Sequence, residues 1–363
     1  MVEKEAADPV SRAGIYYWKC DRPAAFHGTQ TRSSTDAGIE DALREELLNH
    51  FGASTVSLGV GAGQGNHLTW NAEVDGTPMF IRVENGPEKD GHLAVESKLL
   101  DRVRECGVLT PLVHGCDVRR SRVPFAWQAI ERLAEPDLNR WYQQGSLNVT
   151  RVGFEIGEAV AKWQEITPSG FGVLDVSLNG LEASYSSYFR LHLKRHLAFL
   201  VQRGFLEPDD SEEIAALITE HESLLDLPKG CLVHKDMALW NILGTPELIT
   251  AFIDFDDAIS GDPMDDLSLL ACFHDATFLR RAFEGYQSRR ALPAEYRRRF
   301  WLHLLRNMIV KAVIRVGAGY FERDAQFFLI GQKGSGAQLK TFTLERIRTA
   351  MRGLRVDLDI ESV

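Results

Sequence analysis

The sequence contains no run of 18 or more apolar residues, so no helix is expected to span a membrane. Its first residues, MVEKE, are polar and have no apolar stretch behind them, which argues against a secretory signal. The five cysteines are an odd number, lie far apart and include no C-x-x-C pair. This pattern favours reduced thiols over a disulfide framework or a zinc site, and we expect a soluble, cytoplasmic protein.

Basic residues are fewer than acidic ones. There are 41 lysines and arginines against 51 acidic residues, which gives a net charge of −10 and argues against binding to nucleic acid or anionic lipid. An acidic surface would suit a cationic small molecule such as an aminosugar. The chain has 363 residues, enough for two lobes that each have a core of their own.

Strand-forming residues dominate the first third of the chain. Asp75-Gly76 separates two β-prone runs and predicts a hairpin, and apolar residues recur at helical spacing within 95–103. Residues 39–133 are therefore predicted to form a small antiparallel sheet with one inserted helix. Residues 1–38 form an N-terminal extension, and we expect its aromatic cluster at 15–18 to pack back on the body.

Helical patterns dominate from residue 134 onward. Helices are expected at 182–203, at 211–226 and, after a mobile loop at 331–341, at about 342–353. A short β-like insertion is expected at 230–258. The prediction is therefore an α+β fold with two lobes, in which residues 134–363 form the larger and mainly helical one.

The most informative residues lie within the β-like insertion. Two apolar runs flank the turn-forming segment 244–247 and predict a hairpin that brings Asn241 close to Asp254, with Asp236 on the loop before it. Phosphoryl transfer needs such a group of residues. One carboxylate accepts or orients the proton of the attacking hydroxyl, while a second carboxylate and an amide oxygen hold Mg²⁺.

The motif His-x-Asp, the Asn five residues later, Ile-Asp, and the Gly-Asp-Pro-x-x-Asp-Leu segment at 261–267 resemble the signature of a known family. That family is the aminoglycoside phosphotransferase and choline kinase branch of the protein-kinase-like superfamily. The resemblance covers about residues 55–330 and implies a kinase-like fold. It implies these roles: catalytic base Asp236, magnesium ligands Asn241 and Asp254, and supporting residues His234 and Asp256.

Three further positions in this region concern structure more than chemistry. The resemblance implies that Asp262 and Asp266 fix loops and cap a helix. Lys235 departs from the family, which usually has glycine between the His and the Asp. We expect the lysine to be tolerated, with its amine near an acidic neighbour.

The nucleotide-binding side has weaker signals. A glycine-rich stretch at 59–65 is typical of a loop that covers phosphates, and it is not a Walker A loop because no Gly-Lys-Ser/Thr follows. The alternative is that Arg82, on the next strand, faces outward and that Glu96, on the following helix, is a solvated charge. The resemblance implies the following nucleotide-binding residues: Gly63, Gly65, Asn66, Arg82 with its partner Glu96, and the hinge residues Glu131 and Leu133.

The expected activity is transfer of the γ-phosphoryl group of ATP, or of GTP, to a hydroxyl of a small molecule. The resemblance favours an aminoglycoside or related antibiotic as acceptor, nearest the hygromycin-type enzymes, and hence a role in antibiotic resistance. Glu135, Asp137 and Glu284 are candidates for binding such a cation, or they are surface charges. Alternatives are a metabolic kinase of the choline, homoserine or sugar type and a non-catalytic nucleotide-binding protein. Both a monomer and a dimer are compatible with the sequence.

Overall fold

A computed structural model of the chain describes residues 12–21, 37–61, 67–85, 88–323 and 334–363. The described chain divides into two compact units. The first contains Arg12 and residues 37–101 and 111–134, and the second contains 13–21, 102–110 and 135–363, apart from the gaps given above. No helix in the described parts combines the length and apolarity that crossing a bilayer requires.

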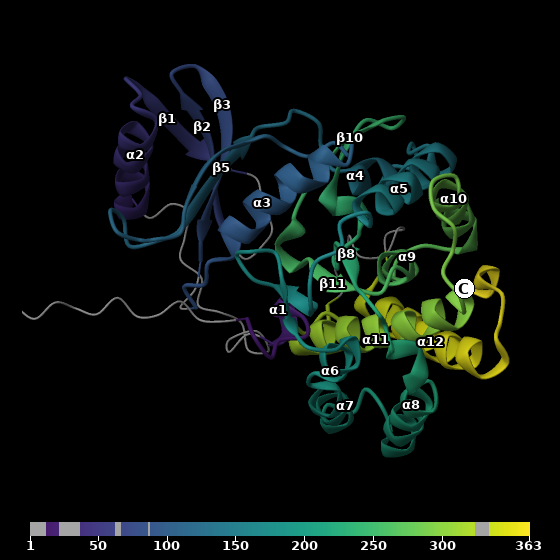
Figure 1. Cartoon of the computed structure of the whole chain (residues 1–363). Coiled ribbons are helices and arrows are strands. Elements are labelled where there is room, and N and C mark those ends of the chain that lie inside the picture. Colours follow the sequence, from purple (N-terminus) through teal and green to yellow (C-terminus); the bar gives the residue numbers. More distant parts are fainter. Residues whose placement is uncertain (1–11, 22–36, 62–66, 86–87, 324–333) are drawn as a thin grey trace, which may run out of the picture. The chain divides into compact units, whose positions relative to one another are not determined.

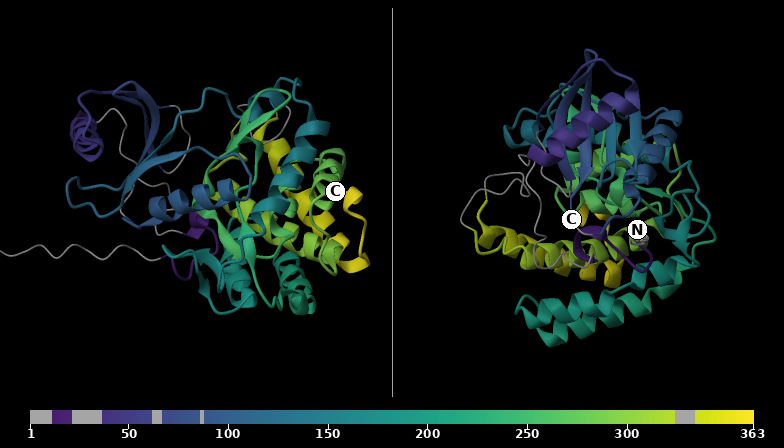
Figure 2. Two further views of the ribbon diagram at one scale, coloured as in Figure 1. Left: turned by 45° about the horizontal axis from the view of Figure 1, so that its top comes forward. Right: turned by 90° about the vertical axis from the view of Figure 1, so that its left-hand side faces the viewer.

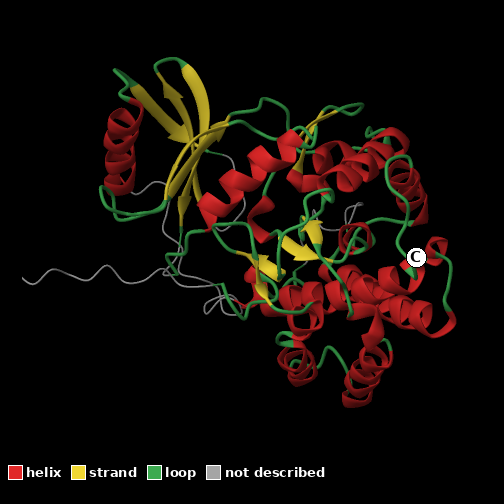
Figure 3. Ribbon diagram, in the orientation of Figure 1, coloured by secondary structure: helices red, strands yellow, loops and turns green. Residues whose placement is uncertain are grey.

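The first unit is built on one antiparallel sheet in the order β1-β2-β3-β5-β4 (Figures 1 and 3). Its strands are β1 (Val56–Val60), β2 (His67–Val74), β3 (Thr77–Glu84), β4 (Val113–Asp117) and β5 (Trp127–Glu131). The predicted hairpin is confirmed. Asp75 and Gly76 connect β2 to β3 with φ values of 45° and 82°, the left-handed conformation that this turn requires.

Two helices belong to this part of the chain, α2 (Ala37–Phe51) and α3 (His92–Glu105). Leu43 and Leu47 of α2 are fully buried in one apolar core with Trp70 and Trp127 of the sheet. The α3 helix lies where the apolar spacing within 95–103 predicts it.

The second unit is mainly helical, as Figure 3 shows. Its helices are α1 (Trp18–Asp21), α4 (Leu138–Gln143), α5 (Val149–Trp163), α6 (Tyr185–Arg190), α7 (Leu193–Gln202), α8 (Pro208–Glu220), α9 (Asp265–Leu270), α10 (Ala276–Gln287), α11 (Tyr296–Gly317) and α12 (Gly336–Val356). Short 3₁₀ turns lie at Glu222–Leu225, Leu239–Asn241, Phe255–Asp257 and Ile360–Ser362. The α11 helix is central: α7, α9 and α12 pack against it, and α12 runs beside it in both views of Figure 2.

The β-like insertion contributes strands to two small sheets. One is the predicted hairpin of β9 (Ile242–Gly244) and β10 (Ile249–Phe252). The other has the order β7-β6-β11-β8, with β6 (Phe171–Leu174), β7 (Gly180–Glu182), β8 (Cys231–Val233) and β11 (Ile259–Gly261). The sequence did not predict β6 and β7, because strands of three or four residues carry too little alternation to be recognised.

Three predicted helix boundaries are wrong for identifiable reasons. The helix expected at 182–203 is two helices, because His192 has a φ of 55° and Arg306 binds the carbonyl oxygens exposed at the break. The helix expected at 211–226 begins at Pro208, a residue suited to a first turn, and ends at Glu220. The last helix begins at Gly336, inside the predicted loop, where Ser335 and Gln338 form a capping box.

The described part of the N-terminal extension, residues 13–21, belongs to the second unit; we call it the N-terminal strap. Tyr16 stacks on Tyr188 of α6 with ring centroids 4.9 Å apart, and the Tyr188 hydroxyl donates to the Tyr16 carbonyl at 2.6 Å. Residues 15–18 are all buried, so the prediction that the aromatic cluster packs on the body is confirmed.

Candidate active site

The loop from His234 to Ala238 follows β8, and a carboxylate on α9 fixes its start. Asp266 accepts hydrogen bonds from the backbone N–H groups of His234 at 3.0 Å and Lys235 at 3.1 Å. It also accepts one from the indole N–H of Trp163 at 3.1 Å. This buried carboxylate therefore sets the path of the loop immediately before Asp236.

His234 links this loop to the segment after β10. Its Nδ1 accepts a hydrogen bond from the backbone N–H of Asp236 at 3.3 Å, and its Nε2 donates to the Ile253 carbonyl at 2.9 Å. Because Asp254 follows Ile253 directly, one imidazole connects the backbone at Asp236 with the backbone that carries Asp254.

The β9–β10 hairpin places Asn241 next to both Asp236 and the segment that carries Asp254. The Asn241 amide nitrogen donates to the Asp236 carbonyl at 2.8 Å and to its Oδ2 at 3.1 Å. The Ile253 N–H donates to the Asn241 carbonyl at 3.0 Å, and Asp254 then adopts the left-handed conformation with φ 67°. The amide nitrogen of Asn241 is directed to Asp236, which leaves the side-chain oxygen as the atom suited to a metal.

Two lysines from distant parts of the chain bind the Asp236 carboxylate. Lys19 of α1 lies 2.5 Å from Oδ2, and Lys311 of α11 lies 3.1 Å from Oδ1. Burial alone would raise the pKa of Asp236, but the two ammonium groups outweigh it and hold that pKa well below its usual range. Asp236 is therefore ionised at neutral pH.

Lys19 also approaches two other carboxylates. Its Nζ lies 3.3 Å from Asp257 and 3.7 Å from Asp254. Burial would lower the pKa of Lys19, but Asp236 and its other anionic neighbours raise it well above its usual value, so the amine stays charged. Two acidic residues follow Phe255. Asp257 is the one that reaches Lys19, and Asp256 is buried in the same 3₁₀ turn.

Lys235 occupies the position where the resemblance leads us to expect glycine. Its φ is 68°, in the left-handed region that glycine adopts most easily. Its ammonium group is buried, 2.7 Å from Asp265, 3.2 Å from the Asn307 side-chain oxygen and 3.0 Å from the Tyr16 hydroxyl. As expected, the amine has an acidic neighbour, and its charge is directed away from Asp236.

In the first unit, Arg82 of β3 donates to Glu96 of α3, and both side chains are buried. This pair excludes the alternative in which they are two unconnected surface charges. Glu131 at the end of β5 exchanges hydrogen bonds with Leu112, at 2.7 Å through its N–H and 3.1 Å through its carboxylate. Leu133 follows β5 in an irregular segment. The glycine-loop candidates Gly63, Gly65 and Asn66 lie outside the described residues.

The acidic residues considered for a cationic substrate have other surroundings. Asp137 caps α4 and accepts a hydrogen bond from the Arg140 N–H at 3.1 Å, and Glu284 is paired with Arg281. Glu135 is partly exposed. The sequence signals did not reveal Lys19 or Lys311, because their contacts with Asp236 span 217 and 75 residues.

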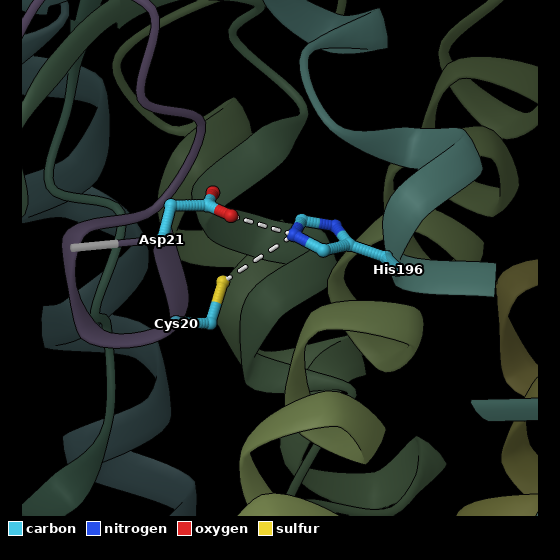
Figure 4. Close-up of side chains that lie close together, drawn as sticks. All are labelled: Cys20, Asp21 and His196. Atoms are coloured by element: carbon cyan, nitrogen blue, oxygen red, sulfur yellow. Dashed lines mark hydrogen bonds and ion pairs between the residues drawn. The ribbon is translucent and has the colours of Figure 1, made fainter. Parts of the chain in front are cut away.

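A second group of potential metal ligands, Cys20, Asp21 and His196, lies buried where the N-terminal strap meets α7 (Figure 4). His196 Nε2 lies 2.8 Å from Asp21 and 3.8 Å from the Cys20 sulfur. Arg306 donates to the Nδ1 atom at 3.0 Å, so Nε2 carries the proton and donates it to Asp21. That nitrogen then has no lone pair for a metal, and the group is a structural link between strap and helix.

Three features together define a kinase-like phosphotransferase. They are a small antiparallel-sheet unit, a helical unit, and a loop whose aspartate is followed by an asparagine and a second aspartate. The profile of the phosphotransferase enzyme family matches residues 58–301. The chain belongs to this family and is a small-molecule kinase. No curated protein matches the sequence.

Solved structures support the fold. A thermostable mutant of aminoglycoside phosphotransferase APH(4)-Ia, in a ternary complex with ADP and hygromycin B, is 15% identical with a TM-score of 0.60, covering 85% of this chain and 98% of its own. Spectinomycin phosphotransferase APH(9)-Ia, in complex with ADP and spectinomycin, is 15% identical (TM-score 0.52; 89% and 98% covered). A protein assigned as a fructosamine-3-kinase from Haemophilus somnus 129PT is 14% identical (TM-score 0.55; 85% and 97%). At these identities the likeness is one of fold.

Proposed function

We propose that the protein transfers the γ-phosphoryl group of ATP, with GTP as the alternative donor, to a hydroxyl of a small molecule, and that Asp236 receives the hydroxyl proton. The observation that carries this proposal is the placement of Asp236. Its buried carboxylate accepts a hydrogen bond from Asn241, and Lys19 forms ion pairs with both this carboxylate and that of Asp254.

The strong depression of the Asp236 pKa fits a particular role. A carboxylate this acidic is a weak base, so it orients the hydroxyl and takes its proton late, as a loose phosphoryl-transfer transition state requires. Asn241 and Asp254 offer the hard oxygen atoms that Mg²⁺ prefers, and we propose them as its ligands. When bound, Mg²⁺ neutralises charge on the nucleotide phosphates. In the first unit, Arg82, held by Glu96, is proposed to contact these phosphates.

An aminoglycoside or related antibiotic is the first acceptor to test, because the resemblance in the catalytic motifs points to that branch. Choline, homoserine and sugars form the alternative group, and the fold likeness to a protein assigned as a fructosamine-3-kinase supports including sugar derivatives. The purified chain would be incubated with ATP or GTP, Mg²⁺ and each acceptor. We expect one product heavier by a single phosphoryl group, formed by the native protein and not by Asp236→Asn. Absence of any nucleotide binding would contradict the proposal.

Lys19 is proposed as a positioning residue, because it binds the carboxylate that receives the proton and reaches Asp254 and Asp257. Lys19→Met is expected to lower kcat about 10- to 100-fold, since the loss of a charge-assisted hydrogen bond lets Asp236 adopt unproductive orientations. The acceptor KM should change less than kcat. Steady-state kinetics with the acceptor identified above measures both constants.

Two further variants control the Lys19 experiment. Lys19→Arg keeps the charge and is expected to recover part of kcat, which a purely structural defect of the strap would not show. Lys194→Met removes an exposed lysine of α7 and should be neutral. An unchanged kcat in Lys19→Met would show that the strap takes no part in the reaction.

A further inference from the structure

Three cationic side chains gather where α11 and α12 pack together. Arg315 lies one helical turn after Lys311 on α11, so both side chains project from the same face. The Arg315 Nη1 donates to the Thr343 hydroxyl of α12 at 2.8 Å, and Arg346 lies three residues after Thr343 on that helix. Because residues three or four apart share a helix face, Lys311, Arg315 and Arg346 belong to one cluster.

Neither arginine of this cluster forms an ion pair within the described residues, and the carboxylate that acts on Arg346 from nearby is Asp275. Arg315 is 2% exposed, its Nη2 has no hydrogen-bond partner, and it forms no ion pair within the part of the chain that the structure describes. The Nη1 of Arg346 is also buried without a partner. Burial lowers the pKa of Arg315 to about 10, and burial lowers that of Arg346 as well, yet both groups stay charged at neutral pH.

A buried imidazole completes the group of unused donors. His274 is 4% exposed, and neither of its ring nitrogens has a hydrogen-bond partner. Its ring stacks on Phe278 at 4.1 Å and meets the edge of Tyr142 at 5.2 Å. Burial, helped by Arg346 and opposed by Asp275, lowers the pKa of His274 to about 3, so the ring is neutral and has one N–H to donate.

The cluster lies beside the atom that is proposed to receive the proton. Lys311 binds Asp236 at 3.1 Å, and Arg315 is one turn farther along α11, or about 6 Å. Phe273, next to His274 in the chain, has its ring centroid 5.4 Å from the Lys311 amine. Arg315 is therefore within the length of a small molecule from Asp236.

Burying an uncompensated guanidinium is costly, and a buried charge is normally paired. An anion from outside the chain would supply the missing partner and would use the free N–H groups of Arg315 and Arg346 in the two-pronged way that guanidinium groups bind carboxylate and phosphate. A cationic acceptor would instead meet these arginines, while Lys19 and Lys311 are already paired with Asp236. The local charge therefore opposes an aminoglycoside.

We propose that Arg315 and Arg346, with Lys311 and His274, form an anion-binding subsite, and that the acceptor of the phosphoryl group is a hydroxyl compound carrying a carboxylate or a phosphate. This substrate class rests on the proposed function; the subsite itself does not. No bond to the anion is made or broken. The subsite binds the anionic end and leaves the hydroxyl at Asp236.

The first experiment measures anion binding without turnover. Thermal denaturation of the full chain is followed in ADP and Mg²⁺ at saturation while inorganic phosphate replaces chloride at constant ionic strength. A ligand that binds only the folded state raises the melting temperature with its concentration. We expect a saturable increase for the native chain and for Arg348→Met, an exposed arginine on α12. Arg315→Met should abolish the increase.

The same variant separates a binding role from a structural one. Methionine fills much of the arginine volume without a buried charge, so Arg315→Met without phosphate should melt at or above the native temperature. A lower melting temperature combined with an unchanged response to phosphate would show that the guanidinium is structural, and would overturn the subsite.

The second experiment compares acceptors that differ only in charge, namely a hydroxy acid with its amide and a sugar with its phosphate ester. We expect kcat/KM to favour the anionic member by roughly 100-fold, and Arg315→Met to remove most of that preference through KM. The two pairs distinguish a carboxylate from a phosphate. Preference for neutral or aminated acceptors would overturn the substrate class. Phosphate binding without transfer to any acceptor would count against the proposed function and leave the subsite standing.

Discussion

Asp236→Asn is expected to lower kcat by roughly 10²- to 10⁴-fold, the usual contribution of a positioned proton acceptor. Asparagine keeps the shape of the side chain, and its oxygen can still accept a hydrogen bond from Asn241. It cannot take a proton, and it removes the charge that pairs with Lys19 and Lys311. The KM for nucleotide should change little, since the proposed phosphate ligands lie elsewhere. Single-turnover measurements with ATP and the identified acceptor isolate the chemical step.

The control for Asp236→Asn is Asp226→Asn, at an exposed carboxylate after the Glu222–Leu225 turn. This control should have native kinetics. The folded state of the Asp236 variant must also be checked, because Lys19 and Lys311 lose the carboxylate between them. Retention of more than about a tenth of kcat in a folded Asp236→Asn would show that another group accepts the proton.

Local chemistry predicts much of this fold. The Asp75-Gly76 turn and the 244–247 turn each lie between apolar runs, and both hairpins are present. The helix break that was missed depends on a distant group. The chain bends at His192 because Arg306, 115 residues from Leu191, binds the carbonyl oxygens there. Periodicity within a window contains no information about such a partner.

Some residues of the candidate site can likewise be found from a local motif, and others cannot. Asp236, Asn241 and Asp254 lie within 19 residues, and a short motif reveals them together. Lys19 and Lys311 come from a strap and a helix whose sequences carry no catalytic signal. Their arrival at Asp236 depends on the packing of Tyr16 on α6 and of α11 at the centre of the second unit. Only the folded chain brings them together.

Net charge and local charge point to different acceptors. A total of −10 suggests a cationic ligand, whereas Arg315, one helical turn from the lysine that binds Asp236, forms no ion pair within the described residues. Surface carboxylates dominate the total, and their field is screened over about 8–10 Å at ordinary ionic strength. Buried groups next to a bound molecule interact with it far more strongly, so the local arrangement decides the preference.

The largest expected effect on stability comes from Lys235→Ala. Lys235 and Asp265 form an ion pair in which both side chains are at most 1% exposed, and removal of one partner from such a pair costs about 3–5 kcal/mol in the free energy of unfolding. Asp265 would keep hydrogen bonds from Asn307, at 2.8 Å, and from the Tyr185 hydroxyl, at 3.5 Å, and no longer have its nearest cation. Alanine also stays at a φ of 68°, so the backbone strain is not relieved. Urea denaturation monitored by circular dichroism measures the loss.

The pH dependence gives a second test of Lys235→Ala. Burial would raise the pKa of Asp265, but Lys235 and His303 outweigh it and keep that pKa below its usual value. The ionised carboxylate therefore stabilises the native chain above the pKa of an unfolded aspartate, and this contribution is lost as the pH falls through the lower folded pKa. Without Lys235 the pKa of Asp265 in the folded chain rises. The difference in the free energy of unfolding between native chain and variant should therefore be largest at pH 7 and shrink toward pH 3.

Lys235→Gly separates the ion pair from the backbone conformation. Glycine loses the same ion pair but adopts positive φ freely, so it should be more stable than Lys235→Ala by about 1 kcal/mol. If both variants unfold like the native chain, the pair only balances its own desolvation and Lys235 is not needed to hold the loop. If alanine is the more stable, the left-handed conformation is not strained. The expected order, native above glycine above alanine, requires both a stabilising pair and a strained backbone at the residue before Asp236.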